Sequence, residues 1–480
     1  MVNGLLSPHV NVQFGAAVVT NEDVGQTDST FIPVIAERGP LTPQAVSSPG
    51  AYEALFGGRH SGFEASYDHV TAITAGSGGR RVMVVRVVGP AAKTATLALQ
   101  DADAGESATI MATSPGAWGN RLSITVQAGA GDEQTVLIQD RDTVVHRWTV
   151  KNLDELAALA ERSPVVRVTV KANGGKKAKV VNKTSLAAGA DDDRAITLEH
   201  VEAALAQLDQ SYGPGQVLAP LWTSEHAHRM LIKHCAATNR VALLDVPRAT
   251  KADTATLSAW AQARETVSQS YVEGTDVAWR AALFPVWVGL VPWGRGGAID
   301  RDVPGSVFAA AVIARNSRNI QPNEQPIAAN GHPAPGVFTE PVIPISAQQR
   351  DHITNQIRAN VPFHEDRDGI RLYGFVSVSS QAPWRQFNRG RFAMALADEI
   401  GDRGEAYIGL SRSEKNRALL KSETEALLDM HVRTGNLTDY QVSVADVMSP
   451  QGVPGWQTNV AAQFGESTEF IVFNVTNRTN

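Results

Sequence analysis

The sequence predicts a multidomain chain of α/β and α+β units with extended terminal arms. Its 480 residues, 43% of them hydrophobic, provide material for several cores. Short apolar strands alternate with amphipathic helices over residues 21–94 and again over 191–345, as is typical of α/β units. Between these stretches, residues 95–190 consist mainly of alternating strand patterns. We therefore expect a central α/β domain made from the two flanking stretches, with a mostly-β domain inserted between them.

The composition argues against several classes of protein. The net charge is −6, with 43 basic and 49 acidic residues, so the basic excess of a nucleic-acid-coating surface is missing. The single cysteine, Cys235, cannot form a disulfide within the chain. The longest apolar stretches, 82–100 and 281–294, are interrupted by charged residues or prolines, and the N-terminus lacks the basic start of a secretory signal. We expect neither membrane insertion nor secretion.

Both ends of the chain carry strand patterns. Residues 1–20 form the expected N-terminal arm, in which Val10, Val12 and Phe14 alternate with polar residues. Residues 468–480 form the C-terminal strand and tail, whose apolar residues are Phe470, Ile471, Val472, Phe473 and Val475. Backbone groups of such strands need partners. Pairing within the chain is the commoner solution, and addition to a sheet of another subunit is the alternative.

The central stretches contain clear elements. Residues 31–36 and 81–88 are apolar enough for buried strands, and residues 52–56 predict a helical turn that Gly57 ends. A strand is also expected at 241–247. In the inserted stretch, residues 152–162 predict a helix that begins at an Asn152 N-cap.

Residues 346–467 predict an α+β unit. Phe392, Leu396 and Ile400 mark one apolar helix face. Residues 407–410 predict a strand, and Ser411 with Glu414 predicts the capping box of a second helix, which Gly435 would end. Tyr440, Val442 and Val444 alternate along a further strand.

We find no catalytic signature. The sequence has no phosphate-binding loop and no nucleophile elbow. The glycines of 76–79 precede a strand, whereas a phosphate cradle follows a strand and opens a helix, so a turn is the expected structure. The charged turn His364-Glu365-Asp366 has no evident cleft, and the lysines between 171 and 183 fit a solvated face.

Two groups of possible metal ligands have simpler interpretations. We interpret Asp191, Asp192 and Asp193 as caps of a following helix, at about 195–209. His226, His228 and His234 lie near Cys235, but the first two would differ by about 200° around a helix and cannot share a face. We expect two solvent-facing histidines and a buried Cys235. No catalytic residue, metal site or cofactor is predicted.

Several strings, taken in order, carry a family resemblance. The most specific is Ser-Pro-Gly-Ala-Trp-Gly-Asn at 114–120, and the others are individually weak. They are Ala36–Pro40 with Tyr52–Gly58, Gly78–Val87, Arg240–Pro247, Ala281–Trp287 and Trp384–Arg391. With these strings the chain resembles, almost end to end, the tail sheath proteins of contractile-tailed phages and related contractile injection systems. It departs from the family pattern at Pro304-Gly305-Ser306 and at Pro8–Val12.

The resemblance implies a fold and a function. Residues 346–467 would form the inner C-terminal sheath domain, and residues 95–190 an outer insertion. Such subunits form stacked six-fold rings around a tail tube and contract without nucleotide or other cofactor to drive the tube through a target cell envelope. The terminal arms would add to a neighbour's sheet, which reverses the preference for pairing within the chain.

The resemblance also implies partners and a location. The partners would be further copies of the chain, a tail tube protein, and baseplate and tail terminator proteins, with no direct contact to nucleic acid. The location would be the virion tail, assembled in the host bacterial cytoplasm and used for genome ejection by a phage, or an injection system derived from one.

A mixed-charge helix start suggests where the tube would be contacted. Our hypothesis assigns this contact to Arg412, Glu414, Lys415, Arg417 and Lys421. The alternative is a solvated helix face. Two further functions remain as alternatives: another structural tail or baseplate protein, and, more remotely, a soluble α/β enzyme, which would need a cleft of titratable groups.

Overall fold

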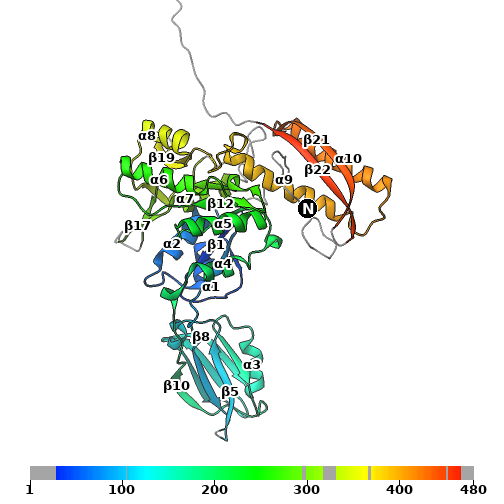
Figure 1. Ribbon diagram of the computed structural model, residues 1–480. Helices are drawn as coiled ribbons and strands as arrows, with labels where there is room; N and C mark the ends of the chain where they lie inside the picture. Colours follow the sequence, from blue (N-terminus) through cyan, green and yellow to red (C-terminus); the bar gives the residue numbers. More distant parts are fainter. Residues whose placement is uncertain are drawn as a thin grey trace, which may run out of the picture.

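The computed structural model describes residues 29–465, except 104, 294–298, 317–330, 366–368 and 450–451. The chain forms three units: a central α/β body, a group of strands below it, and a hairpin with two long helices at the other end (Figure 1). The mixed α/β fold expected from the sequence is confirmed. Within the described residues, no helix is long and apolar enough to cross a membrane.

The central body is built on a six-stranded sheet with the order β15-β12-β11-β1-β3-β2. All neighbours are parallel except β2, which runs antiparallel to β3. The strands are β1 (Thr30–Val34), β2 (Gln44–Val46), β3 (Val82–Arg86), β11 (Gln216–Leu218), β12 (Val241–Leu244) and β15 (Ala281–Leu283). The strands expected near 31–36, 81–88 and 241–247 are therefore present.

Helices cover both faces of this sheet. One face carries α1 (Pro49–Phe56), α2 (Glu64–Gly76) and α7 (Gly305–Asn316), and the other carries α4 (Leu198–Leu205), α5 (Glu225–Ala237) and α6 (Thr254–Val267). Side chains of β3 alternate between the two cores: Val82 and Val84 pack into the first, Met83 and Val85 into the second. Burial on both faces explains the nearly continuous apolar strand sequences.

Smaller elements complete the body. They are β13 (Tyr271–Val272), β14 (Thr275–Asp276), β16 (Val288–Trp293), β17 (Ile299–Val303), β18 (Phe338–Pro341), α8 (Ala347–His352), β19 (Val361–Glu365) and β20 (Gly369–Tyr373). A π-helical turn, Ile353–Ile357, follows α8 directly and ends at Arg358, whose φ is +61°.

The strands below the body form two sheets, β10-β6-β7-β8 and β4-β5-β9. Their bounds are β4 (Thr96–Gln100), β5 (Glu106–Ala112), β6 (Leu122–Ala128), β7 (Gln134–Asp140), β8 (Thr143–Val150), β9 (Val166–Val170) and β10 (Val181–Ser185). The helix α3 (Leu153–Ala160) packs on them, and the Asn152 side chain accepts from the Glu155 N–H, so the expected N-cap is confirmed. These elements share a core of their own. We call residues 95–190 the inserted unit.

The C-terminal unit contains α9 (Phe387–Glu405), α10 (Glu414–Arg433), β21 (Leu437–Met448) and β22 (Pro454–Phe464). The two strands pair as a long antiparallel hairpin, from Leu437 opposite Phe464 to Met448 opposite Pro454. Phe392 and Leu396 of α9 pack with Leu427 of α10 beneath it. Gly435 has a φ of +77° just after α10, as the helix-stop prediction requires.

Two local predictions in this unit are wrong. Residues 407–410 form a turn and not a strand, and Gly409 in the left-handed region (φ +83°) interrupts any extended conformation. The N-cap of α10 is Ser413 and not Ser411, because the Ser413 hydroxyl accepts from the Asn416 N–H at 3.2 Å. The Asn416 side chain donates to the Ser411 carbonyl instead.

A close contact joins the central body to α9. Trp279 and Trp384 stack with ring centroids 4.6 Å apart. Gly390 of α9 lies so near that an added Cβ would be 2.8 Å from the Trp279 carbonyl oxygen. Because backbone cannot easily yield, this position requires glycine.

Replacement of this glycine should therefore destabilise the protein. Gly390→Ala would gain about 1 kcal/mol of helix propensity, but we expect a net loss of about 1–3 kcal/mol from the overpacked contact. Urea unfolding measures the difference. Gly50→Ala in α1 is the matched control, since nothing lies within 4 Å of its Cβ position, and it should not destabilise. Equal behaviour of the two variants would contradict the contact.

Candidate functional site

The joint between the inserted unit and the central sheet is organised by Arg86. This residue ends β3 and is buried. Its guanidinium donates to the carbonyls of Ala36 (3.0 Å), Gly39 (3.3 Å) and Pro115 (2.9 Å). Burial lowers the pKa of Arg86 to about 10, so it remains charged at neutral pH. One buried cation thus holds the segment after β1 against the inserted unit.

The string 114–120 makes the other half of this joint. The Ser114 hydroxyl accepts from the Gly39 N–H at 3.0 Å. Gly116 has a φ of +136°, and a Cβ there would meet the Trp118 ring and the Glu37 carbonyl. Two strings of the family resemblance, 36–40 and 114–120, therefore contact each other.

Linker residues close the joint. The Asn120 side chain both donates to the Gly189 carbonyl and accepts from its N–H, each at 2.8 Å. Arg121 pairs with Glu37 of the central body and with Asp140 of β7. The incoming and outgoing linkers also pair with each other, Lys93 with Ala190. The inserted unit is attached by several independent contacts.

The three aspartates at 191–193 do not cap α4 as expected. Asp191 accepts from the Ala117 N–H at 2.9 Å, Asp192 accepts from the Ala91 N–H at 2.8 Å, and Asp193 lies 2.7 Å from His60 Nε2. Thr197 caps α4, which is shorter than predicted. The prediction is wrong because the aspartates satisfy backbone groups and a histidine that are distant in sequence.

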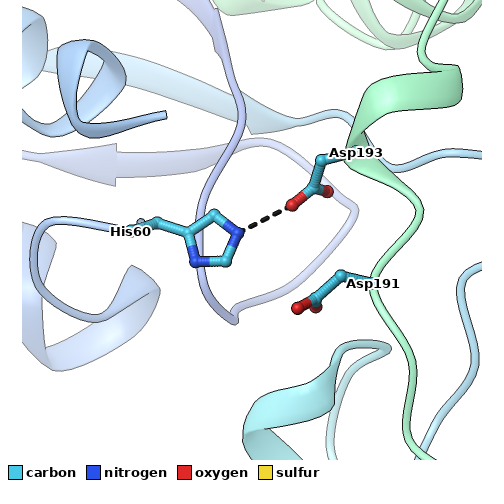
Figure 2. Close-up of side chains that lie close together, drawn as sticks. All are labelled: His60, Asp191 and Asp193. Atoms are coloured by element: carbon cyan, nitrogen blue, oxygen red, sulfur yellow. Dashed lines mark hydrogen bonds and ion pairs between the residues drawn. The ribbon is translucent and has the colours of Figure 1, made fainter. Parts of the chain in front are cut away.

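His60, Asp191 and Asp193 lie together at this joint. Figure 2 shows the imidazole reaching toward Asp193, with Asp191 below, and their ligand atoms lie within 4.8 Å of one another. A histidine with two carboxylates is a donor set that divalent cations accept. Here Asp193 already pairs with His60, Asp191 already accepts from a backbone N–H, and the Arg86 charge acts on both carboxylates. The contacts favour an ion-paired joint.

The helix with the other histidines also differs from expectation. Of the three, only His226 is exposed, while His228 is buried with Nε2 2.8 Å from the Asp245 carbonyl oxygen. His234 is half-buried. The sequence predicts two solvent-facing histidines, but only one is exposed, because the α5 face that carries His228 packs on β12 and His234 is partly covered. Cys235 is buried, as predicted.

A buried serine–aspartate pair escaped the sequence interpretation. The Ser306 N–H donates to Asp245 at 2.9 Å, and its hydroxyl donates to the other carboxylate oxygen. Burial raises the pKa of Asp245 to about 7. His228 contacts only the Asp245 backbone, so the serine-to-imidazole contact of a hydrolase is not formed. The pair joins β12 to the start of α7, and its two members lie in the strings Arg240–Pro247 and Pro304-Gly305-Ser306, which gave no sign that they meet.

Two of the five proposed tube-contact residues, Arg412 and Arg417, bind one carboxylate. Arg412 and Arg417 both pair with Asp446 of β21, at 2.7 and 3.1 Å, and Arg417 also pairs with Glu414. Lys421 pairs with Glu425 along α10. Within the described residues, no ion pair or hydrogen bond holds Lys415. The arginines therefore fix the helix start to the hairpin, and Lys415 offers its charge to solvent.

The hairpin itself presents two open edges. Among the described residues, β21 and β22 pair only with each other. The face toward α10 is apolar, with Val442, Val460 and Ala462, and the opposite face is polar. The predicted arm strands, with Val10, Val12 and Phe14 and with 470–475, lie outside the described residues.

Solved structures of known proteins have a fold similar to that of this chain over most of its length. No protein-family model matches the chain, and no curated protein matches it. The sheath tail protein of Listeria innocua has a TM-score of 0.62 at 14% identity, covering 92% of this chain and 96% of its own. That of Desulfitobacterium hafniense has a TM-score of 0.55 at 14% identity, with coverage of 95% and 100%. An extracellular contractile injection system sheath in its contracted state has a TM-score of 0.53 at 11% identity, with coverage of 100% and 99%. The chain has the fold of these sheath proteins.

The pairing of His60 predicts a pH dependence of stability. The hydrogen bond to Asp193, followed by the charges of Asp193, Asp191 and Glu37, raises the pKa of His60 above its ordinary value. The His60–Asp193 pair therefore contributes to folding stability. This contribution is complete below the pKa of histidine in the unfolded chain, about 6.5, and is lost as pH rises through the pKa of His60 in the folded protein.

Unfolding midpoints in urea between about pH 6 and about pH 8 should show this loss. At the lower pH, the His60→Gln variant should be less stable than the unaltered protein. Its unfolding midpoint should also change less between the two pH values. His226→Gln, at an exposed position, is the control and should keep the profile of the unaltered protein. A His60→Gln profile parallel to that of the unaltered protein would refute the assignment.

Proposed function

We propose that this chain is a structural sheath subunit that polymerises as stacked six-fold rings around a tail tube and contracts to drive the tube through a target cell envelope. The observation that carries the proposal is the likeness of fold over nearly the whole length of both chains, including a sheath in its contracted state. The sheath fold is thus present from the central body to the hairpin.

The open hairpin supports strand exchange between subunits. An unpaired strand edge is a template for a strand from another chain. The hairpin has an apolar inner face, and an arm in which Val10, Val12 and Phe14 alternate with polar residues would extend that face. In this proposal the N-terminal arm and the 470–475 strand of neighbouring copies add to the two edges. Backbone pairing would keep subunits linked while their bodies move.

The remaining parts of the proposal follow from the same architecture. The C-terminal unit lies inward, against a tail tube protein, and the inserted unit lies outward. Baseplate and tail terminator proteins cap the two ends of the polymer. The assembly is part of a virion tail or a related injection system. Contraction uses free energy stored during assembly and needs no cofactor.

Deletion of residues 1–16 tests arm exchange. We expect the full chain, expressed alone, to form striated hollow tubes in electron micrographs, and the deleted chain to form none. The triple variant Val10→Asp, Val12→Asp, Phe14→Asp should also fail, because it removes the apolar face of the strand. Asn11→Asp with Gln13→Glu is the control on the other face and should still assemble. Normal tubes from the deleted chain would refute arm exchange.

Lys415 provides a test of tube contact. Lys415→Glu should reduce assembly on purified tubes, scored by electron microscopy, without lowering the unfolding midpoint, because no hydrogen bond or ion pair to Lys415 occurs among the described residues. Arg417→Glu should instead lower the unfolding midpoint slightly, because it loses exposed ion pairs with Asp446 and Glu414. Exposed Lys233→Glu, on α5 of the central body, is the control. Normal sheathed tubes from Lys415→Glu would exclude this residue from the contact.

A further inference from the structure

One face of α9 is packed against the central body in its first half and is acidic in its second half. At 100° per residue, its members fall within about 80° of one another; they are Phe387, Arg391, Met394, Asp398, Asp402 and Glu405. The first half of the face packs on the central body, where Phe387 and Met394 join the core and the Asn239 amide donates to the Met394 carbonyl at 2.8 Å. The second half presents three carboxylates.

These carboxylates are electrostatically uncompensated. No hydrogen bond or ion pair to the Asp398, Asp402 or Glu405 side chain occurs in the described part of the chain. Burial, and then the charge of Asp402, raise the pKa of the half-buried Asp398 to about 6. Carboxylates near a helix C-terminus oppose the helix dipole, and a like-charged pair four residues apart repels. The isolated subunit thus carries an unfavourable charge arrangement that a cationic partner would relieve.

The same chain carries a complementary surface on its central body. Arg264 of α6 and Arg358, after the π-helical turn, both donate to the Ser379 carbonyl, at 3.1 and 2.7 Å. The largely exposed Glu265 pairs with Arg264, but no carboxylate among the described residues pairs with Arg358. Burial, and then the Arg358 charge, lower the pKa of Arg264. The two guanidinium groups therefore meet at one carbonyl, and only that of Arg264 is paired with a carboxylate, so the Arg264–Arg358 pair retains positive charge.

We propose that the acidic face of α9, Asp398, Asp402 and Glu405, docks on the Arg264–Arg358 pair of a second copy of this chain. The occupant is identified by charge complementarity between two surfaces of the same chain that do not contact each other among the described residues. Because the two surfaces differ, the contact is heterologous, and repetition builds rings or helical stacks. This inference rests on the proposed sheath function and specifies one contact between subunits.

A charge exchange tests the contact. Asp402→Arg and Arg358→Asp should each raise the protein concentration at which polymers form by at least about tenfold. Sedimentation measures this concentration. The double variant, which restores opposite charges, should return to within about threefold of the unaltered chain. Aspartate tolerates the left-handed conformation at position 358.

Matched controls lie in the inserted unit. Arg141→Asp replaces an arginine with a similar φ of +56°, and Asp142→Arg replaces an exposed aspartate beside it. Both controls should polymerise like the unaltered chain, and circular dichroism should show that all variants fold.

Each other outcome counts against the contact. Single variants that assemble normally, or a double variant that stays defective, would overturn it and leave the sheath proposal standing. Asp402→Arg that assembles alone but fails only on tubes would assign the acidic face to the tube. An unaltered chain that remains monomeric at every concentration would overturn both proposals.

Discussion

The buried cation Arg86 fixes how the inserted unit is attached to the central body. Arg86 lies at the end of β3, where the chain leaves the central sheet for an excursion of about a hundred residues, and it binds backbone carbonyls on both sides of that departure. A buried charge is costly unless its donors are satisfied. The position of the inserted unit is therefore tied to the solvation of this guanidinium, and the pairing of Lys93 with Ala190 and of His60 with Asp193 reinforces it.

The C-terminal hairpin of β21 and β22 is stabilised by different contacts. A two-stranded hairpin is marginally stable by itself, and here it depends on the apolar side chains beneath it and on Arg412 and Arg417, which hold Asp446. Its edges remain available to other strands. The molecule thus combines a body stabilised on both faces of its sheet with a C-terminal unit whose hairpin has unpaired outer edges among the described residues.

Much of the fold was predictable because it depends on local patterns. The strands β1, β3 and β12 are apolar throughout, and the α3 cap depends on two residues three positions apart. Errors occurred where neighbouring residues compete or distant ones intervene. Ser411 and Ser413 offer the same cap to α10, and tertiary geometry selects between them.

The candidate site was less predictable than the fold. The 114–120 string was recognised as specific, but its contact with Glu37 and Gly39 requires the folded chain. The roles of Asp191 and Asp193 depend on partners far away in the sequence, His60 being 133 residues from Asp193. Such pairings leave no local period or spacing, so the sequence suggested a helix cap instead. The terminal arms stay predictions, since they lie outside the described residues.

The place where the inserted unit leaves and rejoins the body has a consequence for variation of the surface. Its two linkers run antiparallel and are hydrogen-bonded side by side at Lys93 and Ala190, so the excursion begins and ends at nearly one point of the sheet. A module with adjacent termini can be exchanged at such a point without altering the strand order of the body. The central body can therefore accept a different inserted unit, by natural variation or by grafting, while its own sheet and the C-terminal unit remain unchanged.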